Sequence, residues 1–283
     1  MSGVRAWAAG RPAAARLGLA LIALLCLYAF VGPHLSPHSP TDIDYTALSA
    51  GPGARHWFGT NRIGQDVFAQ TARGLQKSLL ISVSVSAATT ALAALVGTCA
   101  GYFGGWTDHA LTFLVDLLLV VPGFLVLVVV ASRLRNAGWP AYAAAIAALG
   151  WMVTARAVRA MARSLRERPY VRAARHMGVR PLRIVRGHLL PHLAPFLITH
   201  ATIAAAAAVV AEAGLSFVGF GVQPPDVSLG TLMADSAEVA LTYPWMFFFP
   251  TGMLLCFVLA VNLVGEALRT RLDPVAAWAA VRR

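Results

Sequence analysis

Charged residues are scarce in this chain of 283 residues. They make up only 12% of it, against 58% hydrophobic residues, and the only lysine is Lys77. An ordinary soluble domain carries about 25% charged residues. The composition therefore excludes an ordinary soluble domain and predicts a protein that folds in lipid.

The motifs of common catalytic sites are missing as well. The single lysine follows Gln76, so no Gly-x-x-x-x-Gly-Lys-Ser/Thr loop is present to hold ATP phosphates. The sequence contains neither His-Glu-x-x-His nor Gly-x-Ser-x-Gly, and no paired aspartates at membrane depth. We therefore expect no catalysis and no cofactor in this chain, and any ATP hydrolysis must take place on another polypeptide.

Cysteine is rare, and its placement is uninformative about function. Cys26, Cys99 and Cys256 all lie in apolar surroundings, where a free cysteine behaves as a small hydrophobic residue. Neither a disulfide framework nor the spacing of a metal site is visible. We expect no metal in this chain.

Long apolar runs dominate what is present. Six stretches lack Asp, Glu, Lys and Arg, namely 17–41, 78–107, 117–132, 136–155, 187–211 and 239–265. A helix needs roughly 20 residues to cross the bilayer core. The third run reaches that length only if it extends back through Asp116 to about Ala110. The sequence predicts an all-α membrane protein with six transmembrane helices, the first at 17–32.

The basic residues are divided unequally between the two sides of this topology. Of the 23 Lys and Arg residues, 17 fall in the two ends of the chain and in the loop 156–186. Basic residues accumulate on the cytoplasmic side of membrane proteins. We therefore expect cytoplasmic tails at 1–16 and 269–283 in a plasma membrane protein, and not a nucleic-acid binder despite the net charge of +11.

The remaining chain divides into two outer segments and a core. Residues 33–77 are expected outside the cytoplasm, and 78–268 form a core of five helices that includes the cytoplasmic loop 156–191. The segment 212–233 is rich in Gly and Pro and is expected to be partly re-entrant, because irregular backbone at membrane depth must be surrounded by protein or line a cavity.

A short helix is predicted within the cytoplasmic loop, from about Pro169 to Met177. Proline suits a first helical turn, and Gly178 suits the position just past a helix end. At 100° per residue, one face holds Tyr170, Ala173, Ala174 and Met177, and the opposite face holds Arg172, Arg175 and His176. Such a helix either lies on the lipid surface or docks in a groove of a partner protein.

The same loop resembles the signature of ABC importer permeases, EAA-x3-G-x9-I-x-LP. The matching residues are Ala173, Ala174, Gly178, Leu190 and Pro191, whereas Arg172 replaces the signature's Glu and His188 replaces its Ile. In that family this helix couples the permease to its ATPase. The resemblance thus implies docking, and it implies that the polar contact made by the usual Glu is lost or reversed here.

Three further regions extend the resemblance to the dipeptide, oligopeptide and nickel permeases, of the second permease type. The outer motif is matched by His56, Gly59, Thr60, Gly64 and Asp66, and 214–225 is similar to the family's GLSFLGLGVQPP stretch. A C-terminal pattern is matched by Asn262, Leu263, Gly265, Leu268, Leu272, Asp273 and Pro274.

The resemblance implies a type I importer built from this chain, a second permease, two ATPase subunits that bind ATP and magnesium, and an extracytoplasmic substrate-binding protein. Its expected substrates are dipeptides or oligopeptides, with nickel chelates or glutathione-like solutes as the alternative. An ion-driven secondary transporter and a membrane scaffold without transport are the rival readings.

Two carboxylates are placed at membrane depth by this topology, Asp116 in the third run and Glu212 at the end of the fifth. A carboxylate there costs several kcal/mol unless it is paired or hydrated. Either residue is a candidate for the translocation path, and the alternative is that each links neighbouring helices or reaches an interface.

Overall fold

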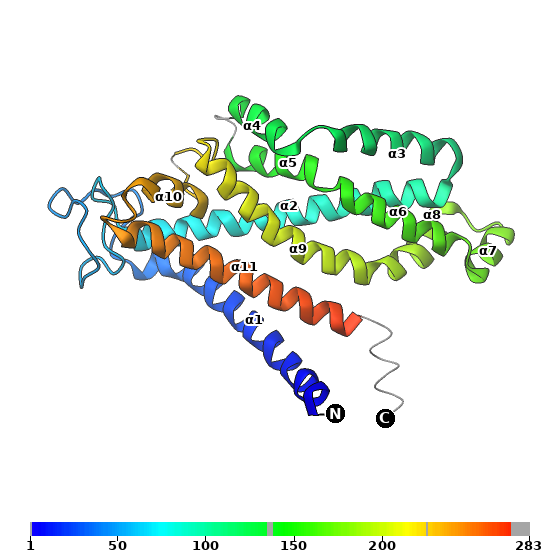
Figure 1. Ribbon diagram of the computed structural model, residues 1–283, viewed down its shortest axis with the longest axis horizontal. Coiled ribbons are helices and arrows are strands. Elements are labelled where there is room, and N and C mark those ends of the chain that lie inside the picture. The colour runs from blue at the N-terminus through cyan, green and yellow to red at the C-terminus, as the bar shows by residue number, and fades with distance from the viewer. Residues whose placement is uncertain (1, 135–137, 225, 273–283) are drawn as a thin grey trace.

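The computed structural model describes residues 2–134, 138–224 and 226–272 (Figure 1). Its elements are α1 Ser2–Leu35, α2 Val67–Phe103, α3 Gly105–Val120, α4 Gly123–Arg133, α5 Gly138–Gly150, α6 Met152–Arg166, α7 Pro169–His176, α8 Pro181–Ile184, η1 Val185–Leu189, α9 Leu190–Phe217, α10 Leu229–Ser236, η2 Ala237–Val239 and α11 Pro244–Leu272. The only β-type pairing in these ranges is an isolated bridge between Thr60 and Asp66. The predicted all-α class is confirmed.

Four single helices and two bent helix pairs are long and apolar enough to cross a membrane. The single spans are Ala13–Leu35, Val67–Phe103, Pro181–Phe217 and Pro244–Thr270. The pair α3 and α4 is bent by 81° and the pair α5 and α6 by 47°. Counting each pair as one span gives the six crossings expected from the sequence.

The larger bend lies in the third run, at Pro122. The residue before a proline disfavours helical backbone, and Val121 accordingly adopts an extended conformation (φ −79°, ψ 128°). The sequence count did not foresee this break, because an apolar run does not show where its backbone turns.

The first two helices are longer than their apolar runs. α2 begins at Val67, since Asp66 caps it by accepting a hydrogen bond of 2.8 Å from the Ala69 amide. Arg73 and Lys77 lie inside the helix, and Lys77 Nζ pairs with Asp226 at 2.8 Å. The segment between α1 and α2 is therefore 36–66 and not 33–77, because a charge ends an apolar run without ending a helix.

Two glycines one turn apart let α2 pack closely on α6. A Cβ at Gly97 would lie 2.5 Å from the carbonyl oxygen of Ala155, and one at Gly101 would lie 2.5 Å from that of Arg159. Small residues four apart permit such backbone contact in membranes. α2 also packs against α1, α3, α5 and α9, so it is the central helix of the bundle.

The bundle has two distinct ends (Figure 1). The segment 36–66 and α10 lie at one end, whereas α7 lies at the other. The first residues of α1 and the last of α11 extend toward the α7 end. Large apolar side chains along the sides are exposed, including Leu24, Leu95, Phe113 and Leu255. This is the surface expected of a protein bounded by lipid.

Some residues used in the sequence comparison lie outside the described ranges. These are Arg135, Asn136, Pro225, Asp273, Pro274, Arg282 and Arg283.

Candidate functional site

The short helix predicted in the loop 156–191 is present as α7. Pro169 occupies the first turn of α7, as expected, and the helix ends at His176. Its buried side chains are Val171 and Ala174, 1% and 5% exposed. They join an apolar cluster with Val158 and Ala162 of α6, Ile184 of α8 and Leu193 of α9. α7 is thus fixed to the ends of two long helices.

The outward face of α7 differs from the face predicted by the sequence. Tyr170 is 40% and Met177 75% exposed, and Arg172 and Ala173 are exposed as well. Ala174 is buried within the chain and does not share that face. The sequence grouping overlooked Val171, which lies three residues before Ala174 and draws that side of the helix inward. Arg175 and His176 are exposed too. We use the name outward face of α7 for Tyr170, Arg172, Ala173 and Met177.

Gly178 ends the helix in the left-handed conformation that its type predicts. Its φ is +75°, and the Val179 amide donates to the Ala174 carbonyl at 3.1 Å. This six-residue closure is a Schellman motif. A Cβ on Gly178 would meet no atom within 4 Å. Only the backbone conformation demands glycine at this position.

The second half of the signature lies where α8 continues through η1 into α9. Leu190 is half-buried and Pro191 is exposed. η1 is a turn of π-helix. Pro191 has no amide hydrogen, and its ring would clash with the carbonyl of Gly187 in a regular helix, so the widened turn just before it has a local cause.

Two histidines of this junction contact the outward face of α7. The ring of His192 stacks on that of Tyr170, with 5.6 Å between ring centroids and 3.3 Å between Tyr170 Oη and His192 Nε2. The ring of His188 lies 5.9 Å from Tyr170. The sequence pattern does not connect the two histidines with Tyr170, because His192 lies 22 residues further along the chain.

Asp116 forms an ion pair within the bundle. Its Oδ1 accepts a hydrogen bond of 3.1 Å from Arg156 Nε, and each side chain is about half exposed, 50% and 51%. Asp108 pairs in the same way with Arg159, whose Nη2 donates to Oδ2 at 2.7 Å. The two pairs join α3 to α6.

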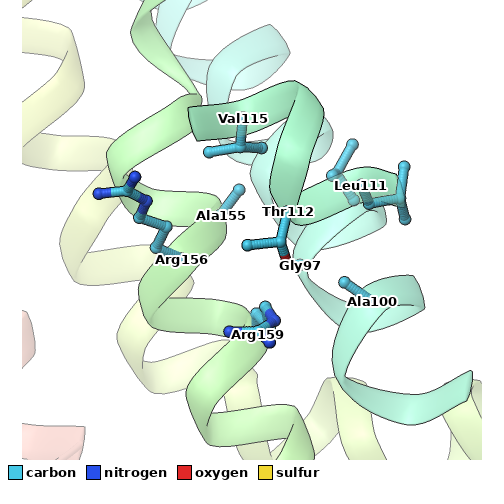
Figure 2. A pocket seen from close by; sticks show the side chains of 9 residues that line it. Gly97, Ala100, Leu111, Thr112, Val115, Ala155, Arg156 and Arg159 are labelled. Carbon is cyan, nitrogen blue, oxygen red and sulfur yellow. The ribbon is translucent and has the colours of Figure 1, made fainter. Parts of the chain in front are cut away.

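A small hollow of about 10 Å³ lies beside these pairs, between α2, α3 and α6. Figure 2 shows Val115 and Thr112 facing Ala155 across it, with Arg156 and Arg159 on the side of α6. This volume holds about one water molecule. It is too small to be a substrate site.

Glu212 is fully buried and has no exposed surface. Its Oε1 accepts hydrogen bonds from Ser216 Oγ at 2.9 Å and from Ser228 Oγ at 2.6 Å. A Cβ on Gly230 would lie 2.8 Å from Oε2, so the backbone there is close to the carboxylate. The carboxylate has no surface exposed to water, and its hydrogen bond to Ser228 joins α9 to the N-cap of α10.

The outer motif of the sequence holds the segment 36–66 against the bundle. Gly59 and Gly64 have φ of +76° and +85°, and added Cβ atoms would lie 2.5 Å from the Ala50 oxygen and 2.3 Å from the Asp44 oxygen. The Thr60 carbonyl accepts a hydrogen bond of 3.1 Å from Trp245 Nε1. The glycines of the motif are required by backbone conformation and close contact.

Comparison with known proteins matches two parts of the chain to families of transport permeases. Residues 63–276 match the family described as binding-protein-dependent transport system inner membrane component, and residues 13–52 match the N-terminal transmembrane domain of oligopeptide transport permease C. The oligopeptide transport system permease protein OppC of Mycobacterium tuberculosis is 48% identical over 265 residues, covering 93% of this chain and 91% of the relative. The dipeptide transport system permease protein DppC of Bacillus subtilis is 33% identical, covering 92% and 81%.

A solved structure shows the same fold. The MetNI methionine ABC transporter in an inward-facing conformation contains a chain that aligns with a TM-score of 0.58 and 21% identity, covering 72% of this chain and 96% of that one. The family match covers most of the described bundle, including α7 and the junction into α9. The chain therefore belongs to the family of inner-membrane components of binding-protein-dependent transport systems, the permease subunits of ABC importers.

Proposed function

We propose that this chain is one of two permeases in a peptide importer of the prokaryotic plasma membrane, with both termini in the cytoplasm. Two ATPase subunits supply the energy, and an extracytoplasmic binding protein delivers dipeptides or oligopeptides. The substrate is inferred from the printed names of the relatives, which are oligopeptide and dipeptide permeases.

The observation that carries the coupling role is the outward face of α7. Its buried side packs on α6, α8 and α9, while Arg172, Ala173 and Met177 are exposed at one end of the bundle and Tyr170 is partly exposed beside them. A small residue between two larger ones forms a narrow surface that fits a groove. We assign this face to the ATPase subunit, and Gly178, Leu190 and Pro191 to the support of the helix.

The apolar cluster under α7 would transmit a movement of α7 to the helices it packs against. Val171 and Ala174 touch residues of α6 and α9, so a displaced α7 carries the ends of both helices with it. Closely packed side chains are hard to compress, so helices that share an apolar cluster move together. Closure of the ATPases on ATP would then bias the permease pair between its inward-facing and outward-facing states.

Asp116 and Glu212 receive linking roles in this proposal. Asp116 holds α3 to α6 through Arg156, and Glu212 holds the end of α9 to the start of α10 through Ser228. Linking was the alternative to a path role for both residues. It is favoured here because each carboxylate has a partner on a neighbouring element.

Charge reversal at Arg172 tests the coupling. Arg172 is exposed and stands where the family signature has Glu. Arg172→Glu should weaken co-purification of the ATPase subunits, and reversing an acidic residue of the ATPase groove should restore it. If Arg172→Glu assembles and transports normally, Arg172 makes no contact that matters for the ATPase, and only Tyr170, Ala173 and Met177 remain to form the contact surface.

Substrate and orientation need separate measurements. Proteoliposomes with the complete complex should take up labelled dipeptides or oligopeptides only with ATP and the binding protein. Uptake of nickel chelates or glutathione instead would refute the peptide assignment, and uptake driven by an ion gradient alone would refute the importer. Single cysteines at Asp226 and Arg180 should react with an impermeant thiol reagent from opposite sides of the membrane.

A further inference from the structure

A cluster of histidines and aspartates lies in the segment 36–66, at the end of the bundle opposite α7. His38 follows the end of α1, Asp66 caps the start of α2, and His56 and Asp44 come from the chain between them. One donor atom each from His38, His56 and Asp66 lies within 4.8 Å of the others. The cluster lines a hollow of about 400 Å³.

His56 is the centre of this cluster, and its two ring nitrogens differ. Nδ1 donates to Asp66 Oδ2 at 2.8 Å, while Oδ1 of the same aspartate accepts from the Ala69 amide. The ring is 5% exposed, and its buried Nε2 forms no hydrogen bond with any residue the structure describes. The ring is therefore oriented by a carboxylate at one nitrogen, and in its neutral form it carries a lone pair at the other.

A second carboxylate faces that lone pair. Asp44 Oδ2 lies 3.5 Å from His56 Nε2, whereas Asp44 Oδ1 accepts hydrogen bonds from the Thr46 amide and hydroxyl. These hydrogen bonds fix the carboxylate through Oδ1 and leave Oδ2 directed at His56. A separation of 3.5 Å is long for an N–H···O hydrogen bond. It is close to the spacing of about 3.3 Å between two ligands of a tetrahedral zinc ion with bonds of about 2.0–2.1 Å.

His38 lies beside His56, and one of its ring nitrogens is within 4.8 Å of a donor atom of His56 and of Asp66. Its ring stacks on that of His56, with 4.5 Å between centroids, and its Nε2 donates to the Arg55 carbonyl at 3.1 Å. Its Nδ1 is then unprotonated and able to bind a cation. Histidine and carboxylate donors together suit divalent transition metals such as zinc.

We propose that His38, His56 and Asp44 bind a divalent transition-metal cation of the zinc type, with Asp66 orienting His56. The pattern of carboxylate, histidine and metal is common in metal sites, where the carboxylate fixes the tautomer of the ligand. The ion would tie the end of α1 and the start of α2 to the segment between them. The site is a structural clamp on the outer segment, and it does not depend on the substrate carried by the importer.

No metal was expected from the sequence, and the spacing explains why. His38 and His56 are 18 residues apart, and Asp66 follows ten residues later. Such intervals belong to no short ligand motif. The competing explanation is a protonated His56 that bridges Asp44 and Asp66 without a metal.

Cobalt titration separates the two explanations. The full chain, in detergent and stripped of metal with a chelator, is titrated with Co²⁺, whose visible absorption reports its ligands, and Zn²⁺ is then added in competition. We expect about one Co²⁺ per chain that Zn²⁺ displaces. His38→Ala and His56→Gln should lower the affinity at least tenfold, and Asp66→Asn should lower it about 10- to 100-fold, as loss of an orienting carboxylate does elsewhere.

His34→Ala is the matched control, because His34 is an exposed histidine at the end of α1 that does not belong to the cluster. Its Co²⁺ affinity should equal that of the unmodified chain. His38→Ala retains the bond between His56 and Asp66, so an unchanged circular dichroism spectrum would attribute its loss of binding to the missing ligand. Absence of Co²⁺ and Zn²⁺ binding by the unmodified chain, or equal binding by His38→Ala and His56→Gln, would overturn the proposal and leave the protonated bridge.

Discussion

The hydroxyl of Ser228 donates a hydrogen bond of 2.6 Å to Oε1 of Glu212, which lies sixteen residues earlier in the chain. Ser228 is also the N-cap of α10, where its side chain accepts from the Thr231 amide at 3.1 Å. One serine thus starts a helix and donates to one oxygen of a buried carboxylate. The end of α9 and the start of α10 are held together by this relationship.

Ser228→Ala should destabilise the chain by about 1–3 kcal/mol, because it removes a helix cap and leaves Glu212 with one donor fewer. Glu212→Gln retains an acceptor oxygen and should alter the thermal unfolding midpoint much less. Unfolding of the purified complex and peptide uptake are measured together. Reduced uptake by Glu212→Gln at an unchanged unfolding midpoint would return Glu212 to the translocation path.

Ala173→Trp and Ala174→Trp should fail in different ways. Ala173 is exposed on the outward face of α7, so bulk there should release the ATPase subunits while the permease pair stays folded. Ala174 is 5% exposed inside the cluster under α7, so bulk there should destabilise the chain itself by about 1–3 kcal/mol. Co-purification of the ATPases and thermal unfolding distinguish the two. Equal loss of ATPase at normal stability in both variants would contradict the assigned face.

Gly178→Val should cost about 1 kcal/mol or more and re-aim the chain after α7, because a β-branched residue disfavours a φ of +75°. Gly178→Asn is the control, since asparagine tolerates the left-handed region and no atom lies within 4 Å of an added Cβ. Uptake and ATPase binding should fall in the first variant and remain in the second. Equal loss in both would point to a contact with the partner at this position and not to backbone strain.

Gly101→Ala should destabilise the bundle by about 1–3 kcal/mol, because its Cβ would lie 2.5 Å from the Arg159 carbonyl and force α2 away from α6. Gly252→Ala in α11 is the matched change, since its Cβ would meet no atom within 4 Å. That variant should be neutral or slightly stabilising, because alanine favours helix more than glycine does. Thermal unfolding of both variants gives the comparison.

The sequence by itself determined the helical class, the six apolar crossings and the short helix after Pro169. Each depends on local chemistry: an apolar run long enough for a bilayer, a proline in a first turn, and a glycine at a helix end. These signals need no partner elsewhere in the chain. For the same reason α7 begins at the expected Pro169, and Gly178 has the expected left-handed conformation.

Only the tertiary structure decided which groups meet. Ala173 and Ala174 are adjacent in sequence, yet one is exposed and the other buried, because α6, α8 and α9 cover only one side of α7. Glu212 gained a donor from Ser228, and Asp116 gained Arg156, forty residues away. His38, His56 and Asp66 came together because α1 and α2 bring the two ends of one segment to the same place. Such contacts arise from packing over long separations, and a pattern of neighbouring residues does not encode them.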